Sequence, residues 1–326
     1  MKKRIILFGL LLCGFSTTYA QKIDPSATYK VNVQSNDPET TAPDFLLKVC
    51  PFNMNYASTD LDLGWGIGAN YIFDNKFKIE LDYSSAYMYG LTQYKPSYDG
   101  GSSGCTAVGG NSSPNYFSIG ASYFFASSVD EKDVMHTVAH YGNVNYIMKI
   151  PTNVMVLHGV KLGFIHAKTY VESGTGASLT DASGTTYTEQ GDGTMLTKNI
   201  LSVGYVRRST VNLEYSVKGL GERSTKYSSE LYADVLFGIG MNFSDITYYD
   251  RPVNYGDPFI VSNHNVNSTK TSSIGMRVGY LLESQSKVGW YYCGELGLMP
   301  GMAGGITGTF YMAAKIGISL NLRLKD

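Results

Sequence analysis

Histidine spacing is the first pattern in this sequence that could support chemistry. His136 and His140 are four residues apart, the spacing at which two imidazoles on a helix bind one zinc ion. The surrounding segment 134–150 is predicted to be a strand, however, and four residues of strand span about 13 Å. Because this distance is too long for one ion, we predict no metal site.

The remaining candidates for chemistry are weaker. His158, His166 and His264 have no carboxylate or cysteine at metal-ligand spacing. The glycine-rich segment 64–68 lacks the spacing and the following helix of a dinucleotide-binding fingerprint, so its glycines are expected to bend a strand or make room beside one. We therefore expect no cofactor, and the protein is not expected to be an enzyme.

Charged residues at alternate positions form the more informative pattern. From Phe77 to Tyr89 most odd positions are apolar or aromatic, whereas three successive even positions are charged. Since a strand turns alternate side chains to opposite faces, this segment has one apolar face and one charged face. The charged residues that we assign to such polar faces, here and on two later segments, are Lys78, Glu80, Asp82, Arg277, Lys315 and Arg323. Lys161, Asp234 and Glu295 are further candidates on the segments between them.

The same period of two defines the predicted elements along the chain, and no helical period lasts more than a turn or two. The clearest strands cover 61–73, 77–89, 116–125, 272–282 and 310–324. Weaker candidates cover 45–56, 134–150, 154–170, 199–206, 211–218, 229–240 and 288–299. Tight turns are expected at 74–76, 151–153 and 284–287, and long polar connections at 91–115, 172–198 and 241–271.

The N-terminus has the pattern of an export signal. Residues 1–4 are basic after Met1, residues 5–15 are mostly apolar, and Thr18-Tyr19-Ala20 offers a cleavage site before Gln21. The leader carries three positive charges, so removing it changes the net charge from −1 to −4. An acidic mature chain disfavours nucleic-acid binding, which requires a concentrated basic surface.

Composition separates a membrane barrel from a soluble β-protein. Charged residues make up only 16% of the chain, below the roughly 25% of an average soluble protein, while Tyr (26) and Gly (36) are abundant. No stretch after the leader is apolar for the roughly 18 residues of a membrane helix. Because backbone groups in lipid must all be paired internally, such a chain can span a bilayer only as a closed barrel. An exported soluble β-protein is the alternative.

On its leader, its alternating strands with long polar loops and its amphipathic last strand at 310–324, the chain resembles the outer-membrane β-barrel proteins of diderm (Gram-negative) bacteria. The resemblance covers most of 44–326. It implies an all-β fold, a closed antiparallel transmembrane β-barrel with long external loops, for which we predict 12–14 strands because such barrels have even strand numbers. The predicted organisation is a signal peptide at 1–20, a polar N-terminal segment at 21–43 and the barrel at 44–326.

In a barrel the charged set defined above would line the lumen. Mixed signs there can either pair and seal the lumen or line a polar channel. The sequence therefore favours a narrow passive pore for small polar solutes. The alternative is a plugged barrel that acts as scaffold or subunit of an outer-membrane assembly, secretion or adhesion complex through its loops or the segment 21–43. An outer-membrane hydrolase that pairs His158 or His166 with a serine is a third, less favoured hypothesis.

Partners and cysteines complete the sequence-based predictions. The expected partners are outer-membrane lipid and other outer-membrane proteins, and the oligomeric state stays open. Export leaves Cys50, Cys105 and Cys293, which allow at most one internal disulfide. We predict that Cys50 pairs with Cys105, because both flank early loops, and that Cys293 faces the lumen. This bridge would hold the loop 91–115 over the barrel entrance.

Overall fold

Strands make up almost all of the described chain. The computed structural model describes residues 31–38, 44–57, 60–88, 106–109, 114–141, 144–172, 177–180, 186–187, 193–217, 221–243, 246–250, 260–268, 271–302 and 310–323. A search of these residues finds no helix long and apolar enough to cross a membrane. The predicted signal peptide at 1–20 and most of the segment 21–43 lie outside the described residues.

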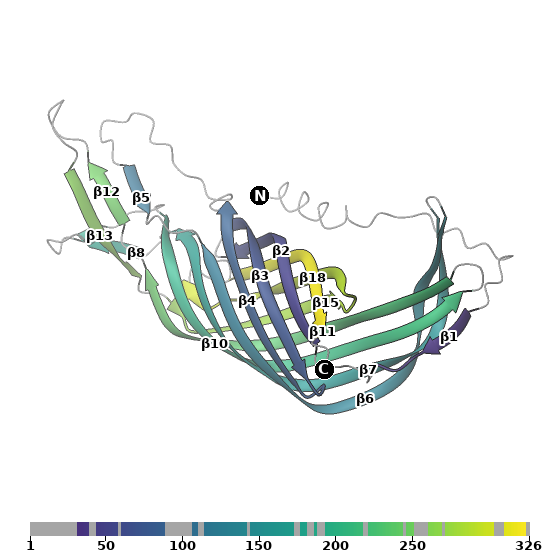
Figure 1. Ribbon diagram of the computed structural model, residues 1–326. Coiled ribbons are helices and arrows are strands. Elements are labelled where there is room, and N and C mark those ends of the chain that lie inside the picture. The colour runs from purple at the N-terminus through teal and green to yellow at the C-terminus, as the bar shows by residue number, and fades with distance from the viewer. Residues whose placement is uncertain are drawn as a thin grey trace, which may run out of the picture. The chain divides into compact units, whose positions relative to one another are not determined.

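Ten antiparallel strands close into a barrel, and the pairing of β7 with β10 completes the ring (Figure 1). The barrel strands are β2 (Asp44–Ala57), β3 (Asp60–Phe73), β4 (Phe77–Met88), β6 (Asn115–Tyr141), β7 (Val144–Glu172), β10 (Gly193–Val217), β11 (Gly221–Phe243), β15 (Ile274–Ser284), β16 (Val288–Leu298) and β18 (Phe310–Arg323). The last strand, β18, pairs with the first, β2, over most of its length. The predicted all-β closed barrel is therefore confirmed.

The predicted number of 12–14 strands is wrong, because the barrel has ten. Several predicted strands are parts of one long strand: β6 joins 116–125 to the start of 134–150, and β10 joins 199–206 to 211–218. The turn expected at 151–153 lies inside β7. Its turn-forming residues are held in extended form by specific bonds, such as the Thr152 hydroxyl to the Ile150 carbonyl oxygen (2.8 Å).

With ten strands, successive connections alternate regularly between the two rims of the barrel. Short links follow β3, β6, β10 and β15 at one rim, and the three long connections follow β4, β7 and β11 at the opposite rim, here called the long-connection rim. Antiparallel neighbours must alternate rims in this way. The chain therefore has the short turns on one side and long loops on the other that outer-membrane barrels share.

The long connections are more ordered than the predicted polar loops. They contain the strands β5 (Thr106–Gly109), β8 (Ala177–Thr180), β9 (Thr186–Tyr187), β12 (Ile246–Asp250) and β13 (Ile260–Ser268). These strands form one sheet in the order β5-β12-β13-β8-β9. A further pair joins β14 (Thr271–Ser272) to β17 (Gly301–Met302). Backbone hydrogen bonds thus connect all three long connections.

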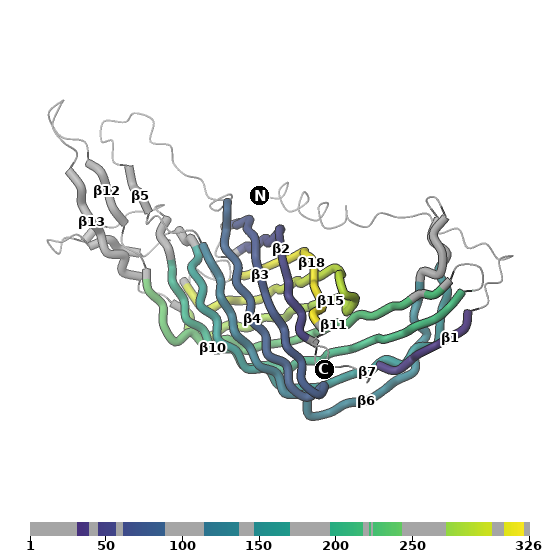
Figure 2. Tube along the Cα trace, viewed as in Figure 1, coloured from purple at the N-terminus to yellow at the C-terminus, as the bar shows by residue number. Residues whose placement is uncertain are grey.

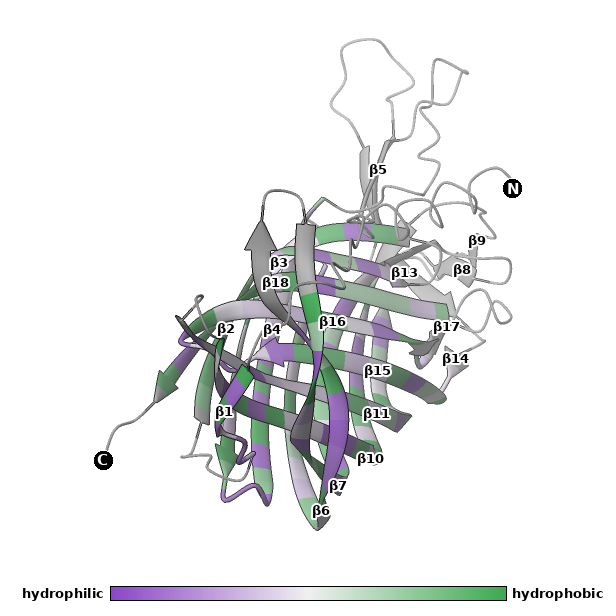
Figure 3. Ribbon diagram, turned by 90° about the vertical axis from the view of Figure 1, so that its right-hand side faces the viewer, coloured by the Kyte–Doolittle hydropathy of each residue, from purple (hydrophilic) through white to green (hydrophobic). Residues whose placement is uncertain are grey.

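Burial alternates along the barrel strands as the sequence predicts. In β15 the even positions from Ile274 to Leu282 are exposed and apolar, while Gly275, Arg277 and Leu281 are buried. Figure 3 shows apolar and polar residues interleaved along the strands. An apolar outer face of this extent suits hydrocarbon rather than water. The barrel fold therefore indicates an outer-membrane location.

The chain divides into two compact units. The first, here called the barrel unit, comprises 39–128, 155–210 and 226–326, and the second, the extension unit, comprises 1–38, 129–154 and 211–225. The strands β6, β7, β10 and β11 contribute residues to both units. In the extension unit β1 (Val31–Ser35) pairs antiparallel with the end of β10, as Figure 2 traces.

Asn36 connects β1 to a second strand of the extension unit. The backbone N–H of Asn153 donates to Asn36 Oδ1 (2.8 Å), and Asn153 Nδ2 donates to the Asn36 carbonyl oxygen (2.9 Å). Asn36 Nδ2 also donates to the Pro151 carbonyl oxygen (3.4 Å). The segment after β1 is therefore bonded to β7, and β1 itself is bonded to β10.

The extension unit has its own core. Leu213 and Tyr215 are buried on β10, and the ring of His136 packs near that of Tyr215 with 5.7 Å between centroids. The two ring nitrogens of His136 each lie 3.2 Å from a threonine hydroxyl, of Thr225 and of Thr152. Burial lowers the pKa of His136 below its ordinary value of 6.5.

Candidate functional site

The barrel interior holds the charged side chains and is the candidate functional site. Lys78 on β4 is 1% exposed, and its Nζ lies 2.9 and 2.8 Å from the two carboxylate oxygens of Glu230 on β11. Three strands separate β4 from β11 around the ring of ten. This ion pair therefore crosses the lumen rather than joining neighbouring strands.

Lys78 also belongs to a wider group of charges. Its Nζ lies 2.8 Å from Glu80, and Glu80 forms a second ion pair with Lys161 on β7. Lys161 lies over the ring of Tyr232, 4.2 Å from its centroid. Two lysines and two glutamates from three strands thus compensate one another inside the barrel.

Arg277 on β15 organises a second group of charges. Its Nε and Nη2 each lie 2.8 Å from Asp234 Oδ2 on β11, and its Nη1 lies 3.5 Å from Glu295 on β16. Nη1 also donates to the Tyr116 hydroxyl of β6 at 3.1 Å. Because β6 and β15 are separated by three strands in the ring, this bond also crosses the lumen.

Tyrosines complete the surroundings of Glu295. The Tyr311 hydroxyl donates to Glu295 Oε2 at 2.6 Å, and the Tyr232 hydroxyl donates to Oε1. Lys315 lies over the ring of Tyr116, 5.2 Å from its centroid. The carboxylate and the two nearby cations are therefore held by aromatic side chains that also fill space.

Glu283 on β15 anchors a third group of charges. It pairs with Lys48 on β2 at 2.6 Å, accepts a bond from Asn70 Nδ2 on β3 at 2.7 Å, and lies 3.8 Å from Arg208 on β10. Arg208 also lies 3.6 Å from Glu230, which connects this group to Lys78. All three groups together are here called the lumen network.

The structure brings most of the predicted charged set into this network. Lys78, Glu80, Arg277 and Lys315 lie on the inner face among the contacts just described, whereas the side chain of Arg323 lies outside the described residues. Asp82 is half-buried beside Gly68 of β3, where a Cβ atom would collide with its carboxylate. The glycine therefore makes room for a charge, as expected for the segment 64–68.

Four members of the lumen network are absent from the predicted set: Lys48, Arg208, Glu230 and Glu283. Glu283 lies an even number of positions after Arg277, and Glu230 lies an even number of positions before Asp234. Strict alternation therefore places each of them on the same face as its neighbour and could have found both. Arg208 falls between two predicted strands that are one strand, β10. Because the prediction ended one strand before Arg208 and began the next after it, alternation could not assign this residue to a face.

The cysteines and the two barrel histidines have other partners. Cys50 and Cys293 are buried and are not bonded to each other, and Cys105 lies outside the described residues, so its pairing with Cys50 stays a prediction. His166 Nδ1 lies 2.8 Å from Asn199 Oδ1, and His158 Nδ1 contacts the Tyr205 hydroxyl. Neither of these contacts is with a serine.

Comparisons with known proteins add little to this description. No protein-family model matches the chain, and no curated protein matches it. Among solved structures it is similar to a five-substitution variant of a porin from Rh. blastica, with 9% identity over 90% of this chain and 100% of that chain and a TM-score of 0.16. The same values hold for an anion-selective porin from Comamonas acidovorans. The strand pairings that close the ring establish the barrel.

Proposed function

We propose that the protein is an integral outer-membrane barrel that is sealed by its lumen network and acts as scaffold or subunit of an outer-membrane complex. The observation that carries this proposal is the set of ion pairs and hydrogen bonds across the lumen, such as Lys78 with Glu230 and Arg277 with Tyr116. Barrels of about 8 strands are filled by side chains, whereas those of about 16 enclose a channel. Ten strands lie near the filled end of this range.

Energetics support a closed interior. A water path along the axis would have to separate cross-lumen pairs whose members are almost completely buried. Removing one partner of a buried ion pair costs about 3–5 kcal/mol, because the remaining charge is left uncompensated. Thermal opening of several pairs at once is therefore rare, and the resting barrel is expected not to conduct.

Strand length supports the scaffold role. A transmembrane strand needs about 9–11 residues, whereas β6, β7, β10 and β11 contain 27, 29, 25 and 23. More than half of each strand is thus left over after crossing the hydrocarbon. The extension unit and the sheet of the long connections offer protein surface to partners, which a minimal pore does not need.

The narrow passive pore that the sequence favoured is the second candidate. The polar inner face supports it, since Lys78, Glu230 and Arg277 would also suit a path for polar solutes if their side chains rearranged. The two candidates differ in one measurable property, the conductance of the resting barrel.

Planar-bilayer conductance of the refolded full chain tests the sealed barrel. We expect no steady current above the lipid baseline for the wild type. The double variant Lys78→Ala with Glu230→Ala is expected to conduct, because it removes a cross-lumen pair and much side-chain volume. A steady ohmic current through the wild-type protein would overturn the sealed barrel and favour the pore.

The scaffold role needs a separate measurement. The native outer membrane is solubilised in mild detergent, and the size of the particle is compared with that of the refolded chain in the same detergent. We expect the native particle to be larger by at least one partner protein. Equal sizes would contradict the scaffold, whatever the conductance.

A further inference from the structure

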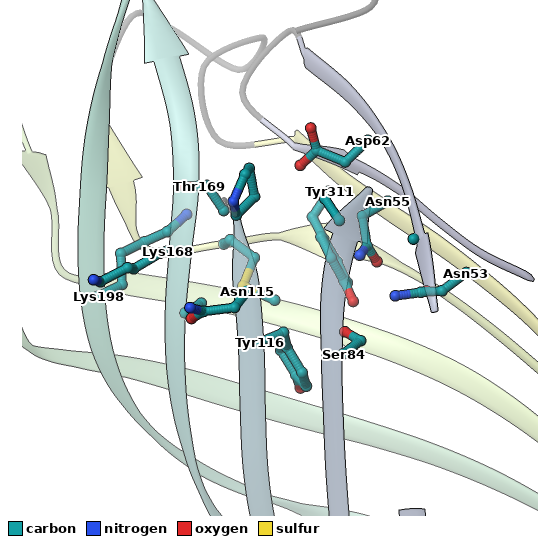
Figure 4. Close-up of a pocket in the computed structure, with 15 residues that line it drawn as sticks. Asn53, Asn55, Asp62, Ser84, Asn115, Tyr116, Lys168, Thr169, Lys198 and Tyr311 are labelled. Carbon is teal, nitrogen blue, oxygen red and sulfur yellow. The ribbon is translucent and has the colours of Figure 1, made fainter. Parts of the chain in front are cut away.

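A cavity opens at the long-connection end of the barrel interior (Figure 4). It comprises about 530 Å³ of space free of protein atoms, part of it open to solvent. Its floor includes Tyr116 and Tyr311, which bind Arg277 and Glu295 of the lumen network. The cavity can therefore hold a molecule even when the lumen below it is sealed.

A buried lysine lines one side of this cavity. Lys198 on β10 is only 1% exposed, and no hydrogen bond or ion pair joins it to another residue within the described ranges. Figure 4 shows Lys198 on the side opposite Asn53, Asn55 and Asp62. A buried ammonium without a counter-charge is costly, so the site is incomplete without an anion.

Unsatisfied acceptors give the cavity a second chemical property. Asn53 Oδ1 and Thr169 Oγ1 are buried, and neither has a hydrogen-bond partner among the described residues. Both residues line the cavity. Since buried polar atoms are almost always paired, a bound molecule that carries hydrogen-bond donors would satisfy them.

We propose that this cavity binds a small organic anion that also carries hydroxyl donors, such as a sugar acid. Its carboxylate pairs with Lys198, and its hydroxyl groups donate to Asn53 Oδ1 and Thr169 Oγ1. Tyr116 and Tyr311 form the floor against which the ring lies. Neutral sugars leave Lys198 uncompensated, and cations are repelled by it.

Isothermal titration calorimetry of the refolded full chain in detergent at pH 7 and low salt tests the site. The probes are D-glucuronate, D-glucose as its neutral counterpart, and inorganic phosphate as an anion without carbon-bound hydroxyls. We expect saturable binding of glucuronate, with glucose and phosphate each at least tenfold weaker. No saturable glucuronate binding, or equal binding of glucose, would overturn the proposal. Equal binding of phosphate would show that the site selects anions in general and would overturn the assignment of an organic ligand.

Variants separate the site from general effects on folding. Lys198→Met keeps an unbranched side chain of similar length and removes its charge. It should weaken glucuronate binding at least tenfold. Lys149→Met, an exposed lysine of the extension unit, is the matched control and should bind as the wild type. If Lys198→Met fails to refold, Asn53→Ala decides instead: it should weaken glucuronate binding and leave phosphate binding unchanged. Unchanged glucuronate binding by a folded Lys198→Met or Asn53→Ala variant would contradict the assignment.

Discussion

The barrel unit and the extension unit differ in where they place charged side chains. In the barrel unit Ile274 is 65% exposed while Lys78 is 1% exposed. In the extension unit Leu213 and Tyr215 are buried, and Asp130 and Lys132 are exposed at the surface. Four strands supply residues to both units, so strand propensity cannot explain the difference. The exposed face of the barrel strands is apolar, which suits lipid, whereas the extension unit exposes charged side chains, which suits water.

Ion pairs give the largest expected difference between the two units. Glu230→Leu removes one of the two carboxylates paired with Lys78 in the barrel unit and should lower the free energy of unfolding by about 3–5 kcal/mol. Asp130→Leu breaks the exposed pair with Lys132 in the extension unit, where both side chains are nearly half exposed, and should change it by less than about 1 kcal/mol. Urea titration of folding into liposomes, followed by mobility on unboiled gels, measures both.

A double variant distinguishes charge from packing at this pair. Lys78→Met combined with Glu230→Leu removes both charges at similar volume, so it should fold better than Glu230→Leu alone. A double variant that is as unstable as the single one would show that the side-chain geometry, rather than the excess positive charge, determines the loss of stability.

Two valines of equal exposure test the medium directly. Val278 in the barrel unit and Val129 in the extension unit are each 45% exposed. Val278→Arg must place a guanidinium in hydrocarbon and should cost about 2–4 kcal/mol, whereas Val129→Arg should cost about 0.5 kcal/mol or less. The same liposome titration compares them. Similar costs at the two positions would mean that β15 does not face lipid.

The faces of the barrel strands could be predicted from sequence, but their number could not. Alternation in 272–282 placed Arg277 inward and Ile274 outward, because burial on one side and lipid on the other act on every residue of the strand. The residues 151–153 have turn-forming composition, yet they lie within β7. Asn153 is held there by Asn36, which is 117 positions away, and such a contact leaves no local signal.

The charged site was predictable to the same extent. The inward position of Lys78 follows from its parity in the strand. Its partner Glu230 is 152 positions away, and which residues meet across the lumen depends on the strand number and the stagger of the closed ring. A wrong strand number therefore prevents prediction of the pairs even where each face is correct.

A smaller effect is expected where β1 is attached to the extension unit. Asn36→Ala removes the acceptor of the Asn153 backbone N–H and should destabilise the docked segment by about 0.5–1.5 kcal/mol. Amide hydrogen exchange in β1 and in the facing part of β10 should become faster, because the free energy of local opening falls by roughly the same amount. Gln34→Ala, which removes only an exposed bond to Glu222, is the control and should leave exchange nearly unchanged. Faster exchange throughout the barrel strands would contradict a local attachment.

The smallest effect is a pH dependence confined to the extension unit. His136 is 2% exposed, and its folded pKa lies below the ordinary value of 6.5 because burial disfavours the charged ring. Below pH 6.5 the unfolded chain therefore binds more protons at this site than the folded one, so stability falls as the pH falls and the loss levels off below the folded pKa. Hydrogen exchange in β1 and the end of β10 should become faster between pH 7 and pH 5, after correction for the intrinsic rate. His136→Gln keeps a polar side chain without this titration and should abolish the pH dependence while the barrel strands exchange as before. An undiminished pH dependence in His136→Gln would assign it to other groups and leave the histidine a packing role only.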